Sequence, residues 1–379
     1  MLLAAEHVLT PTHDMAPGWV DVAGDRVVAV GAGAPPRTAD LDLGAATLAP
    51  GFVDLHVHGG GGASYDKGAE AAATAAATHL GHGTTTLAAS LVTDAPDRTA
   101  RAVRGLAPLV DDGVLAGIHL EGPWLSPLHA GAHRRELLGH PSPAAVDTLL
   151  AAGDGAVRMV TIAPELPGGI EAVRRIRAAG VVVAIGHTDA SYDVTRAAID
   201  AGAGMGTHLF NAMRPLHHRE PGPVGALLEA PVDVELVADG AHLHPAVLRA
   251  VFAARPGRCV LVTDAMAAGG LGDGDFRLGG QAVEVRDGVA RLAGGPGLGA
   301  IAGSTLTLVA AVREAVRAGV PLLEAVTAAT ATPARAWGLD DVGALEAGRR
   351  ADLVVLDEHL EVARVMRSGV WVSPSSSPG

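Results

Sequence analysis

The feature that most constrains the fold is a unit that recurs from Pro50 to about Leu345, in which a short apolar run precedes a stretch of helical character. We predict the strands of these units in FVDLHVH, TTTLAAS, VLAGIHL, VRMVTIA, VVVAIGH, AGMGTHL, VELVADG and CVLVTDA. Eight strand-and-helix units are typical of a closed parallel barrel. The sequence therefore predicts an α/β protein with a TIM-like (β/α)8 barrel over residues 50–345.

The two ends of the chain have a different texture. Residues 1–49 and 346–379 contain short Val-rich runs separated by Gly and Pro turns, which is typical of small antiparallel strands. We predict that both ends build one small β-sandwich domain beside the barrel. Another β-rich stretch, at about 272–297, separates the last barrel strand from its helix and predicts a β-hairpin insertion that packs against the small β domain.

Several predicted barrel strands end in residues that can bind a metal, and catalytic residues of such barrels lie at these strand ends. Alternate side chains of a strand share a face, so His56 and His58 should point the same way, as should His119 and Glu121. Buried imidazoles and carboxylates are costly unless something compensates them. A divalent ion such as zinc, iron(II), manganese or cobalt accepts these ligands. The candidate ligands are His56, His58, Glu121, His187, His208 and Asp264.

This set of residues predicts metal-assisted hydrolysis. A metal held by Glu121, His187 and His208 would keep a position for water, whose pKa falls to about 7 in favourable zinc sites. Asp264 is placed to accept the proton of that water and pass it to a leaving nitrogen, although an Asp here can also cap a helix. His133, on the loop after Glu121, is a candidate donor to the developing oxyanion, and the alternative is a surface loop residue.

Composition restricts the partners. The formal net charge of -13 opposes binding to nucleic acid or to anionic lipid, which both require clustered Lys and Arg. Cys259 is the only cysteine, so neither an internal disulfide nor a thiolate metal cluster can form, and a reducing cytoplasm fits. The first residues do not resemble a signal peptide, and no run reaches the roughly 18 apolar residues of a membrane span. We expect a cytoplasmic protein that acts on a small molecule.

The ordered motifs HVHG, HLEGPWLS followed by GAH, TIAPE, GHTDASY, THLFNAM, REPGPVG, ADGAHLHP, LVTDAM and AGSTLTL match a known family. Over nearly its whole length the chain resembles the N-acetylglucosamine-6-phosphate deacetylases of the amidohydrolase superfamily. The resemblance implies a distorted barrel of the amidohydrolase type. It also implies hydrolysis of N-acetyl-D-glucosamine 6-phosphate to D-glucosamine 6-phosphate and acetate, in amino sugar catabolism and recycling.

The resemblance also implies roles for individual residues. It implies Glu121, His187 and His208 as the principal metal ligands, Asp264 as the acid/base and His133 as the group that polarises the carbonyl. His56 and His58 match a pair that holds a second metal in some relatives, so one or two divalent ions per subunit are expected, with zinc favoured. The implied substrate contacts are Asn211, Ala212, His242, Ala132 and Arg219. In the family the arginine comes from a neighbouring subunit, which implies a homodimer. This chain departs from the family at Ala130, where a Lys is usual, and in MRPLHH before Arg219.

Two alternatives remain open. Another amidohydrolase could act on a different N-acyl substrate, but many of those bridge two metals with a carboxylated lysine inside the barrel. Lys67, the only lysine, follows the first strand and its glycine loop, which is the wrong place, and it also disfavours Schiff-base aldolases. The second alternative is a non-catalytic barrel module, whose mark would be the loss of ligands.

Overall fold

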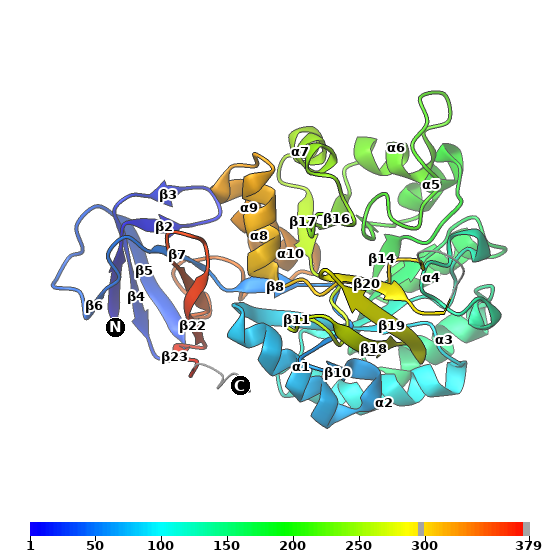
Figure 1. The fold of residues 1–379 in the computed structure, drawn as a ribbon, viewed down its shortest axis with the longest axis horizontal. Coiled ribbons are helices and arrows are strands. Elements are labelled where there is room, and N and C mark those ends of the chain that lie inside the picture. The colour runs from blue at the N-terminus through cyan, green and yellow to red at the C-terminus, as the bar shows by residue number, and fades with distance from the viewer. Residues whose placement is uncertain (295–298, 374–379) are drawn as a thin grey trace.

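The computed structural model describes residues 1–294 and 299–373. It contains a barrel and a smaller region of β-sheet, which lie side by side (Figure 1). No helix in the described ranges is both long enough and apolar enough to cross a membrane.

Eight parallel strands form the barrel in the order β17-β16-β15-β14-β13-β12-β11-β8. They are β8 (Phe52–Asp54), β11 (Thr84–Val92), β12 (Gly117–Glu121), β13 (Val157–Ile162), β14 (Val182–Ile185), β15 (Met205–Gly206), β16 (Asp233–Val237) and β17 (Cys259–Val262). Each lies within or overlaps a run predicted from the sequence, so the predicted barrel is confirmed.

The barrel closes just beyond the regular parts of its first and last strands. The amide of His58 donates to the carbonyl of Ala265 over 2.7 Å, and the amide of Asp264 donates to the carbonyl of His56 over 2.8 Å. Behind this junction the Asp54 carboxylate accepts a hydrogen bond from Thr263 Oγ1 at 2.6 Å. Burial raises the pKa of Asp54 to about 7. The closure therefore places the residues after β8 directly against those after β17.

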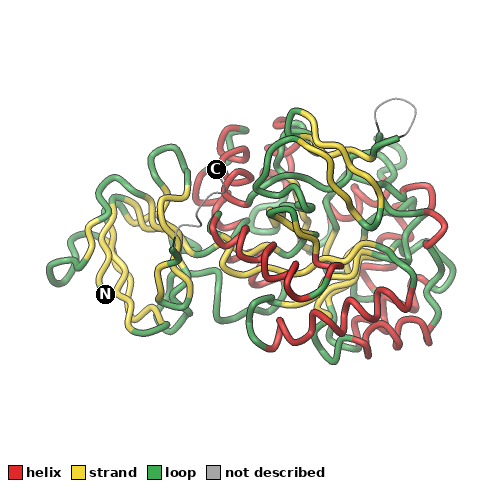
Figure 2. Tube along the Cα trace, turned by 60° about the horizontal axis from the view of Figure 1, so that its bottom comes forward, coloured by secondary structure: helices red, strands yellow, loops and turns green. Residues whose placement is uncertain are grey.

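Helices cover the outside of the barrel (Figure 2). They are α1 (Ala69–Gly81), α2 (Pro96–Asp111), α3 (Pro143–Ala152), α4 (Gly169–Ala178), α5 (Tyr192–Asp200), α6 (Gly222–Glu229), α7 (Pro245–Ala254), α8 (Leu308–Arg317), α9 (Leu322–Ala328) and α10 (Ala331–Ala336). Side-chain caps begin two of them. The hydroxyls of Ser142 and Ser191 each accept a hydrogen bond from the backbone N–H three residues later, which caps the N-termini of α3 and α5. In α8 the buried positions Leu308, Val312 and Ala315 recur at helical spacing and face the core.

Strands from both chain ends build the smaller region, as predicted. One sheet contains β1 (Leu2–Ala5), β4 (Gly18–Ala23), β5 (Arg26–Ala32) and β6 (Leu41–Asp42). The other contains β2 (His7–Leu9), β3 (Asp14–Met15), β7 (Thr47–Pro50), β21 (Leu353–Leu356), β22 (Val362–Arg367) and β23 (Val370–Trp371). The C-terminal strand β21 pairs antiparallel with β7, Val354 opposite Ala49. Buried apolar side chains of both sheets, among them Leu3, Val20 and Leu353, form one cluster.

The insertion after β17 differs from the prediction in its position. It is an antiparallel sheet of three strands, β18 (Gly274–Leu278), β19 (Gln281–Arg286) and β20 (Val289–Leu292), and residues 295–297 of the predicted segment lie outside the described residues. The prediction that it packs against the small β domain is wrong. Its apolar side chains, such as Val283 and Val285, form a cluster with residues 266–268, which follow the last barrel strand. The insertion therefore lies over the barrel, away from the small sheets (Figure 1).

Short elements complete the description. After the first barrel strand come β9 (Gly59–Gly60), β10 (Ala63–Ser64) and a 3-10 turn, η1 (Tyr65–Lys67). After the third come two further 3-10 turns, η2 (Pro127–His129) and η3 (Arg135–Leu137). These loops, together with the insertion, form the rim of the C-terminal end of the barrel.

Candidate active site and metal centre

A cavity of about 360 Å³ opens at the C-terminal ends of the barrel strands. It is lined by all the predicted site residues except two: His58, Glu121, Ala132, His133, His187, His208, Asn211, Ala212, His242 and Asp264. The two that do not line it are His56, which is fully buried against the ligand cluster, and Arg219. The structure thus brings together residues that lie more than 140 positions apart in the sequence.

Three of the predicted ligands form a nearly equilateral triangle. Glu121 ends β12, whereas His187 and His208 each follow a barrel strand by two residues. Glu121 Oε1 lies 3.0 Å from His187 Nε2 and 3.1 Å from His208 Nε2, and the two nitrogens are 3.1 Å apart. Ligands about 2.0–2.1 Å from a tetrahedral zinc ion are separated by edges of ~3.3 Å. The three atoms therefore fit around one ion.

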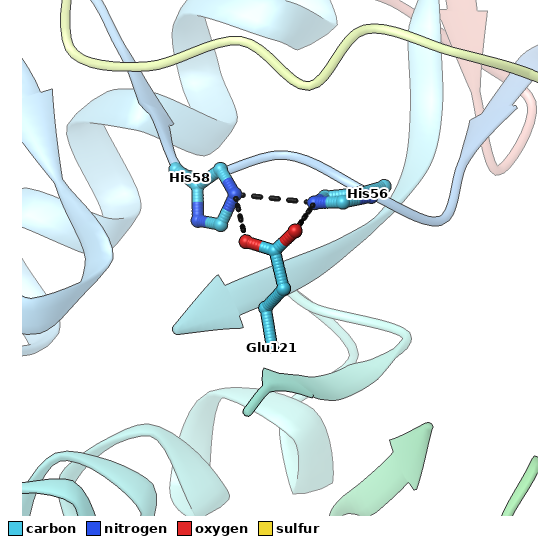
Figure 3. Close-up of side chains that lie close together, drawn as sticks. All are labelled: His56, His58 and Glu121. Atoms are coloured by element: carbon cyan, nitrogen blue, oxygen red, sulfur yellow. Dashed lines mark hydrogen bonds and ion pairs between the residues drawn. The ribbon is translucent and has the colours of Figure 1, made fainter. Parts of the chain in front are cut away.

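A second group lies beside the first and shares Glu121 with it. His56 Nε2 and His58 Nε2 are 3.1 Å apart, and the second oxygen of Glu121 lies 3.3 Å from His58 Nε2 (Figure 3). Asp264 Oδ1 lies 3.5 Å from His56 Nε2 and 3.2 Å from His58 Nε2. Oε1 of Glu121 therefore faces His187 and His208 and also lies 3.6 Å from His56 Nε2, whereas Oε2 faces His58, so the carboxylate of Glu121 is common to both groups.

Hydrogen bonds at the Nδ1 atoms indicate that the Nε2 atoms of two of these imidazoles are suited to bind a cation. The Nδ1 atoms of His58 and His187 donate to the carbonyls of Ser90 and His129, at 3.1 and 2.8 Å. In a neutral ring the Nε2 atom then carries only a lone pair. Lone pairs that face one another and a carboxylate at about 3 Å repel unless protons or a metal ion lie between them. The N and O donors, with no thiolate, suit zinc, iron(II), manganese or cobalt.

The imidazoles and carboxylates of the cluster shift one another's pKa values. Burial alone would lower the pKa of His56, but the carboxylates of Asp264, Glu235 and Glu121 outweigh it and raise that pKa well above its ordinary value. Burial likewise opposes the charged form of His58, yet hydrogen bonds to Asp264 and Glu121 raise its pKa to about 9. For Asp264 burial raises the pKa, but the nearby imidazoles prevail and lower it, so the carboxylate is ionised. A divalent cation meets the same electrostatic need.

The backbone is strained at the residues that carry this cluster. His187 has φ 48°, His208 φ 28° and Asp264 φ 49°, and Ala212 at the cavity wall has φ 49°. Positive φ is uncommon for residues other than glycine and costs of order 1–3 kcal/mol at each position. Three of the eight barrel strands are thus followed by a left-handed residue whose side chain enters the cavity, which indicates a functional rather than a packing role.

His133 is buried, not a surface loop residue. Its Nε2 lies 3.2 Å from Glu121 Oε2, and the Thr93 amide donates to its Nδ1 over 3.3 Å. Because Nδ1 accepts, the proton of the neutral ring sits on Nε2, the atom that faces Oε2 of Glu121 at the cavity wall. Burial lowers the pKa of His133 to about 4, which keeps it neutral. Glu121, His133 and His187 also form a ligand-sized group, but this tautomer makes His133 a donor instead.

The GAH loop can reach the cluster because of its glycine. Gly131 has φ 57°, and a Cβ atom there would lie 3.1 Å from Cε1 of His187. The next residue, Ala132, lines the cavity, and its carbonyl accepts a hydrogen bond from the Gln281 side chain of the insertion. The loop that carries His133 is therefore fixed between the metal ligands and the inserted sheet.

The remaining predicted contacts lie at two different places. Asn211 lines the cavity and donates to the His208 carbonyl at 3.2 Å, and His242 lines it with its Nδ1 bonded to Asp239 at 2.6 Å. Arg219 is exposed and lines a separate hollow of about 440 Å³, next to Arg214. Within a single chain, the structure does not bring Arg219 into the site.

Comparisons with known proteins agree with this geometry. The model of the Amidohydrolase family matches residues 47–372 of the chain. This chain belongs to the amidohydrolase family. A solved structure of a mutant N-acetyl-D-glucosamine-6-phosphate deacetylase from Mycobacterium smegmatis, in complex with N-acetyl-D-glucosamine-6-phosphate, is 54% identical, with a TM-score of 0.95 and 98% of each chain covered.

Curated relatives agree with that match. An N-acetylgalactosamine-6-phosphate deacetylase from Escherichia coli O157:H7 is 38% identical over 368 residues, covering 94% of this chain and 96% of the relative. An N-acetylglucosamine-6-phosphate deacetylase from Bos taurus is 38% identical over 364 residues, covering 90% and 88%. The resemblance seen in the sequence motifs is therefore confirmed.

Sequence reasoning missed the buried Glu235 of this amidohydrolase, and it placed His119 on the face of Glu121 without giving it a role. Glu235, on β16, is fully buried, and its Oε2 lies 3.0 Å from His56 Nδ1. His119, also fully buried, bonds Ser90 Oγ at 2.9 Å and Thr161 Oγ1 at 2.8 Å beneath the cluster. The signal for Glu235 was present, because a lone Glu inside the apolar run VELV needs a buried partner.

Proposed function

We propose that this amidohydrolase removes the acetyl group of N-acetyl-D-glucosamine 6-phosphate, giving D-glucosamine 6-phosphate and acetate. The observation that carries the proposal is the convergence of Glu121, His187, His208 and Asp264 in one cavity. A cavity of about 360 Å³ suits a small ligand such as a single sugar phosphate. The mutant Mycobacterium smegmatis enzyme in complex with this sugar phosphate, 54% identical to the chain, supports the same substrate.

Divalent metal serves the site as its cofactor. The principal position has Glu121, His187 and His208 as ligands, and the second has His56 and His58 with the shared Glu121. Zinc is our first choice, since structural and catalytic zinc sites take these ligand types, and iron(II), manganese and cobalt are the alternatives. When bound, the metal supplies an activated water and polarises the amide carbonyl.

The residues of the chain move the protons and hold the substrate. Asp264, ionised at neutral pH, accepts the proton of the attacking water and then donates it to the leaving nitrogen. His133, with its proton on Nε2, donates to the carbonyl oxygen as negative charge develops there. Asn211, Ala212, His242 and Ala132 contact the sugar phosphate. These six residues line the same cavity.

The phosphate contact involves a second copy of the chain. Arg219 of one protomer pairs with the 6-phosphate in the site of its partner, so the active form is a homodimer. Two observations support this: Arg219 is exposed and outside the cavity of its own chain, and Leu216 in the same loop leaves 49% of its surface exposed. An exposed apolar residue beside an unused guanidinium suits an interface.

A second candidate substrate is N-acetylgalactosamine 6-phosphate. It is favoured by the Escherichia coli relative named for that activity, which is 38% identical over 94% of this chain. The two sugars differ only in the configuration of one hydroxyl, and the reacting acetamide and the phosphate are the same. The chemistry assigned above is unchanged for either sugar.

Acetate release from a panel of N-acetyl sugars tests the proposal. We expect turnover of N-acetylglucosamine 6-phosphate with zinc or another divalent ion present, and loss of turnover with a chelator. N-acetylglucosamine without phosphate should be a poorer substrate by about ten- to a hundredfold in kcat/KM, because a charge-assisted contact is lost. No acetate release from any phosphorylated N-acetyl sugar would contradict the proposal, and preference for the galacto sugar would select the second candidate.

A further inference from the structure

The four imidazoles of the cluster are supported differently at the ring nitrogen that faces away from it. His58 and His187 each donate from Nδ1 to a backbone carbonyl. Nδ1 of His208 has no hydrogen-bond partner among the described residues. Only His56 is supported by a charged group, since its Nδ1 lies 3.0 Å from Oε2 of Glu235.

Glu235 is an unusual residue for its place in the fold. It lies in the middle of β16, flanked by Val234 and Leu236, and none of its surface is exposed. In the described part of the chain it forms no ion pair with an arginine or a lysine, and Oε1 has no hydrogen-bond partner. A buried carboxylate without a strong counter-charge destabilises a fold, so packing does not explain it.

One oxygen of Glu235 contacts a member of each ligand group. Oε2 also accepts the backbone N–H of His208 at 3.2 Å. His208 belongs to the triangle around Glu121 Oε1, whereas His56 belongs to the pair beside Asp264. Glu235 therefore contacts the ring of His56, whereas at His208 it contacts only the backbone N–H and not the ring that faces Glu121.

We propose that Glu235 is a positioning residue that makes the His56–His58 pair a second metal position. Donation from Nδ1 to a carboxylate fixes the tautomer of His56, leaves a lone pair on Nε2 and strengthens that atom as a ligand. The proposal deepens the proposed function and rests on it for the presence of divalent metal at this cluster.

The buried charges favour the same conclusion. Glu235 adds a third buried carboxylate to Glu121 and Asp264, and no arginine or lysine pairs with any of the three in the described ranges. A second divalent ion held by His56 and His58 would lie among these carboxylates, which favours its binding. The principal ion would be held through Glu121 Oε1, whereas Glu235 contacts the ring of His56, a member of the second group.

Metal binding by the Glu235→Leu and Glu235→Gln variants tests the proposal. Each full-length protein is stripped with a chelator and titrated with zinc alone; calorimetry gives the affinities and elemental analysis gives the ions per chain. We expect two ions in the wild type. In Glu235→Leu the second ion should bind about 10- to 100-fold more weakly while the first is retained. Glu235→Gln, whose carbonyl accepts the same proton without charge, should restore part of the affinity.

The matched control is Asp233→Asn, two residues earlier on the same strand. Asp233 is also buried but pairs with Arg335 at 2.8 Å, so this change should lower the thermal midpoint of the metal-free protein and leave both zinc affinities unchanged. Glu235→Leu should do the reverse, with a metal-free midpoint no lower than that of the wild type. This difference separates a positioning role from a structural one.

Three outcomes would overturn the proposal: one ion in the wild type, two ions bound by Glu235→Leu with wild-type affinity, or equal weakening by Asp233→Asn. If Glu235→Leu does not fold, the second-ion affinity of Glu235→Gln decides. Wild-type protein that binds two ions but releases no acetate refutes the proposed function and leaves the role of Glu235 standing. Acetate release with unchanged second-ion affinity in both variants does the opposite.

Discussion

Two carboxylates on one strand show how the ends of the barrel differ. Asp233, at the start of β16, pairs with Arg335 at 2.8 Å and with Arg258 at 3.5 Å. Within the described residues, Glu235, two residues later, forms an ion pair only with the His56 ring. Side chains two apart on a strand share a face, so the same face changes from a neutralised ion pair to a charge that requires a cation. At the N-terminal end of the barrel strands, called here the lower end, the buried charge stabilises the fold. At their C-terminal end, called the upper end, the buried carboxylates serve function.

The backbone shows the same contrast. Away from the cavity, residues other than glycine with positive φ include Asp154, Asp287 and Ser368. All three are exposed and lie in turns, where Asp and Ser are common residues. At the cavity, residues with positive φ include His187 and His208, which are buried and bulky. Strain held in buried histidines must be offset by something they bind, since nothing in turn geometry requires a histidine there.

The largest predicted effect breaks the upper end of the barrel. His208→Ala removes one corner of the ligand triangle, and two remaining protein ligands hold zinc poorly. We expect the principal ion and turnover to be lost together. The fall in kcat should exceed ~10⁴-fold, the upper range for loss of an acid–base group. Elemental analysis and acetate release measure both. His140→Ala, the same change at an exposed position, should keep both, and a His208→Ala protein with full metal and normal turnover would refute the ligand assignment.

A smaller effect separates chemistry from stability. Asp264→Asn keeps the shape of the side chain but removes its ability to take a proton, so kcat should fall by about 10²-fold or more while KM changes little. Asp233→Asn, at the lower end, should reduce the unfolding midpoint and leave kcat per folded molecule unchanged. Thermal melts and steady-state kinetics on both variants check this. The contrast between the barrel ends fails if the two variants exchange these phenotypes.

How much the sequence predicts depends on the range of the interactions involved. Strand ends and the alternation of side chains are local, so the positions of His56, His58 and Glu121 followed from the pattern. The prediction of what the 272–297 insertion packs against was wrong. The pattern shows that Val283 and Val285 need burial, but it does not show which residues bury them. The partner that satisfies a buried charge is equally non-local, which is why Glu235 was missed.

Loop residues show the limit most clearly. Nothing in the local sequence distinguishes the buried His133 from a surface histidine, and its burial depends on Gly131 and on the inserted sheet. Arg219 has the opposite difficulty, since the structure of one chain leaves it outside the cavity. Its assignment to the phosphate stays a prediction, and a dimer is required to test it.

The smallest predicted effect concerns Arg219, which is exposed and lies outside the cavity of its own chain. Arg219→Ala removes one charge-assisted contact to phosphate, worth about 1.5–3 kcal/mol, which corresponds to a ten- to hundredfold loss in kcat/KM for the phosphorylated substrate. Turnover of unphosphorylated N-acetylglucosamine should hardly change, and Arg214→Ala, in the same hollow but paired with Asp189, provides a control for general damage to the loop.

Mixing variants tests whether this arginine acts across an interface. In a mixed dimer of Arg219→Ala and Asp264→Asn subunits, one site combines its own intact Asp264 with an intact Arg219 from its partner. Activity should therefore return in part after subunit exchange, to at most about half of the wild-type value per dimer. Size-exclusion chromatography coupled to light scattering, with one variant carrying a mass tag, shows that mixed dimers form. If they form and activity stays at the sum of the two parents, Arg219 acts within its own chain or not at all, and the site is complete without a second copy.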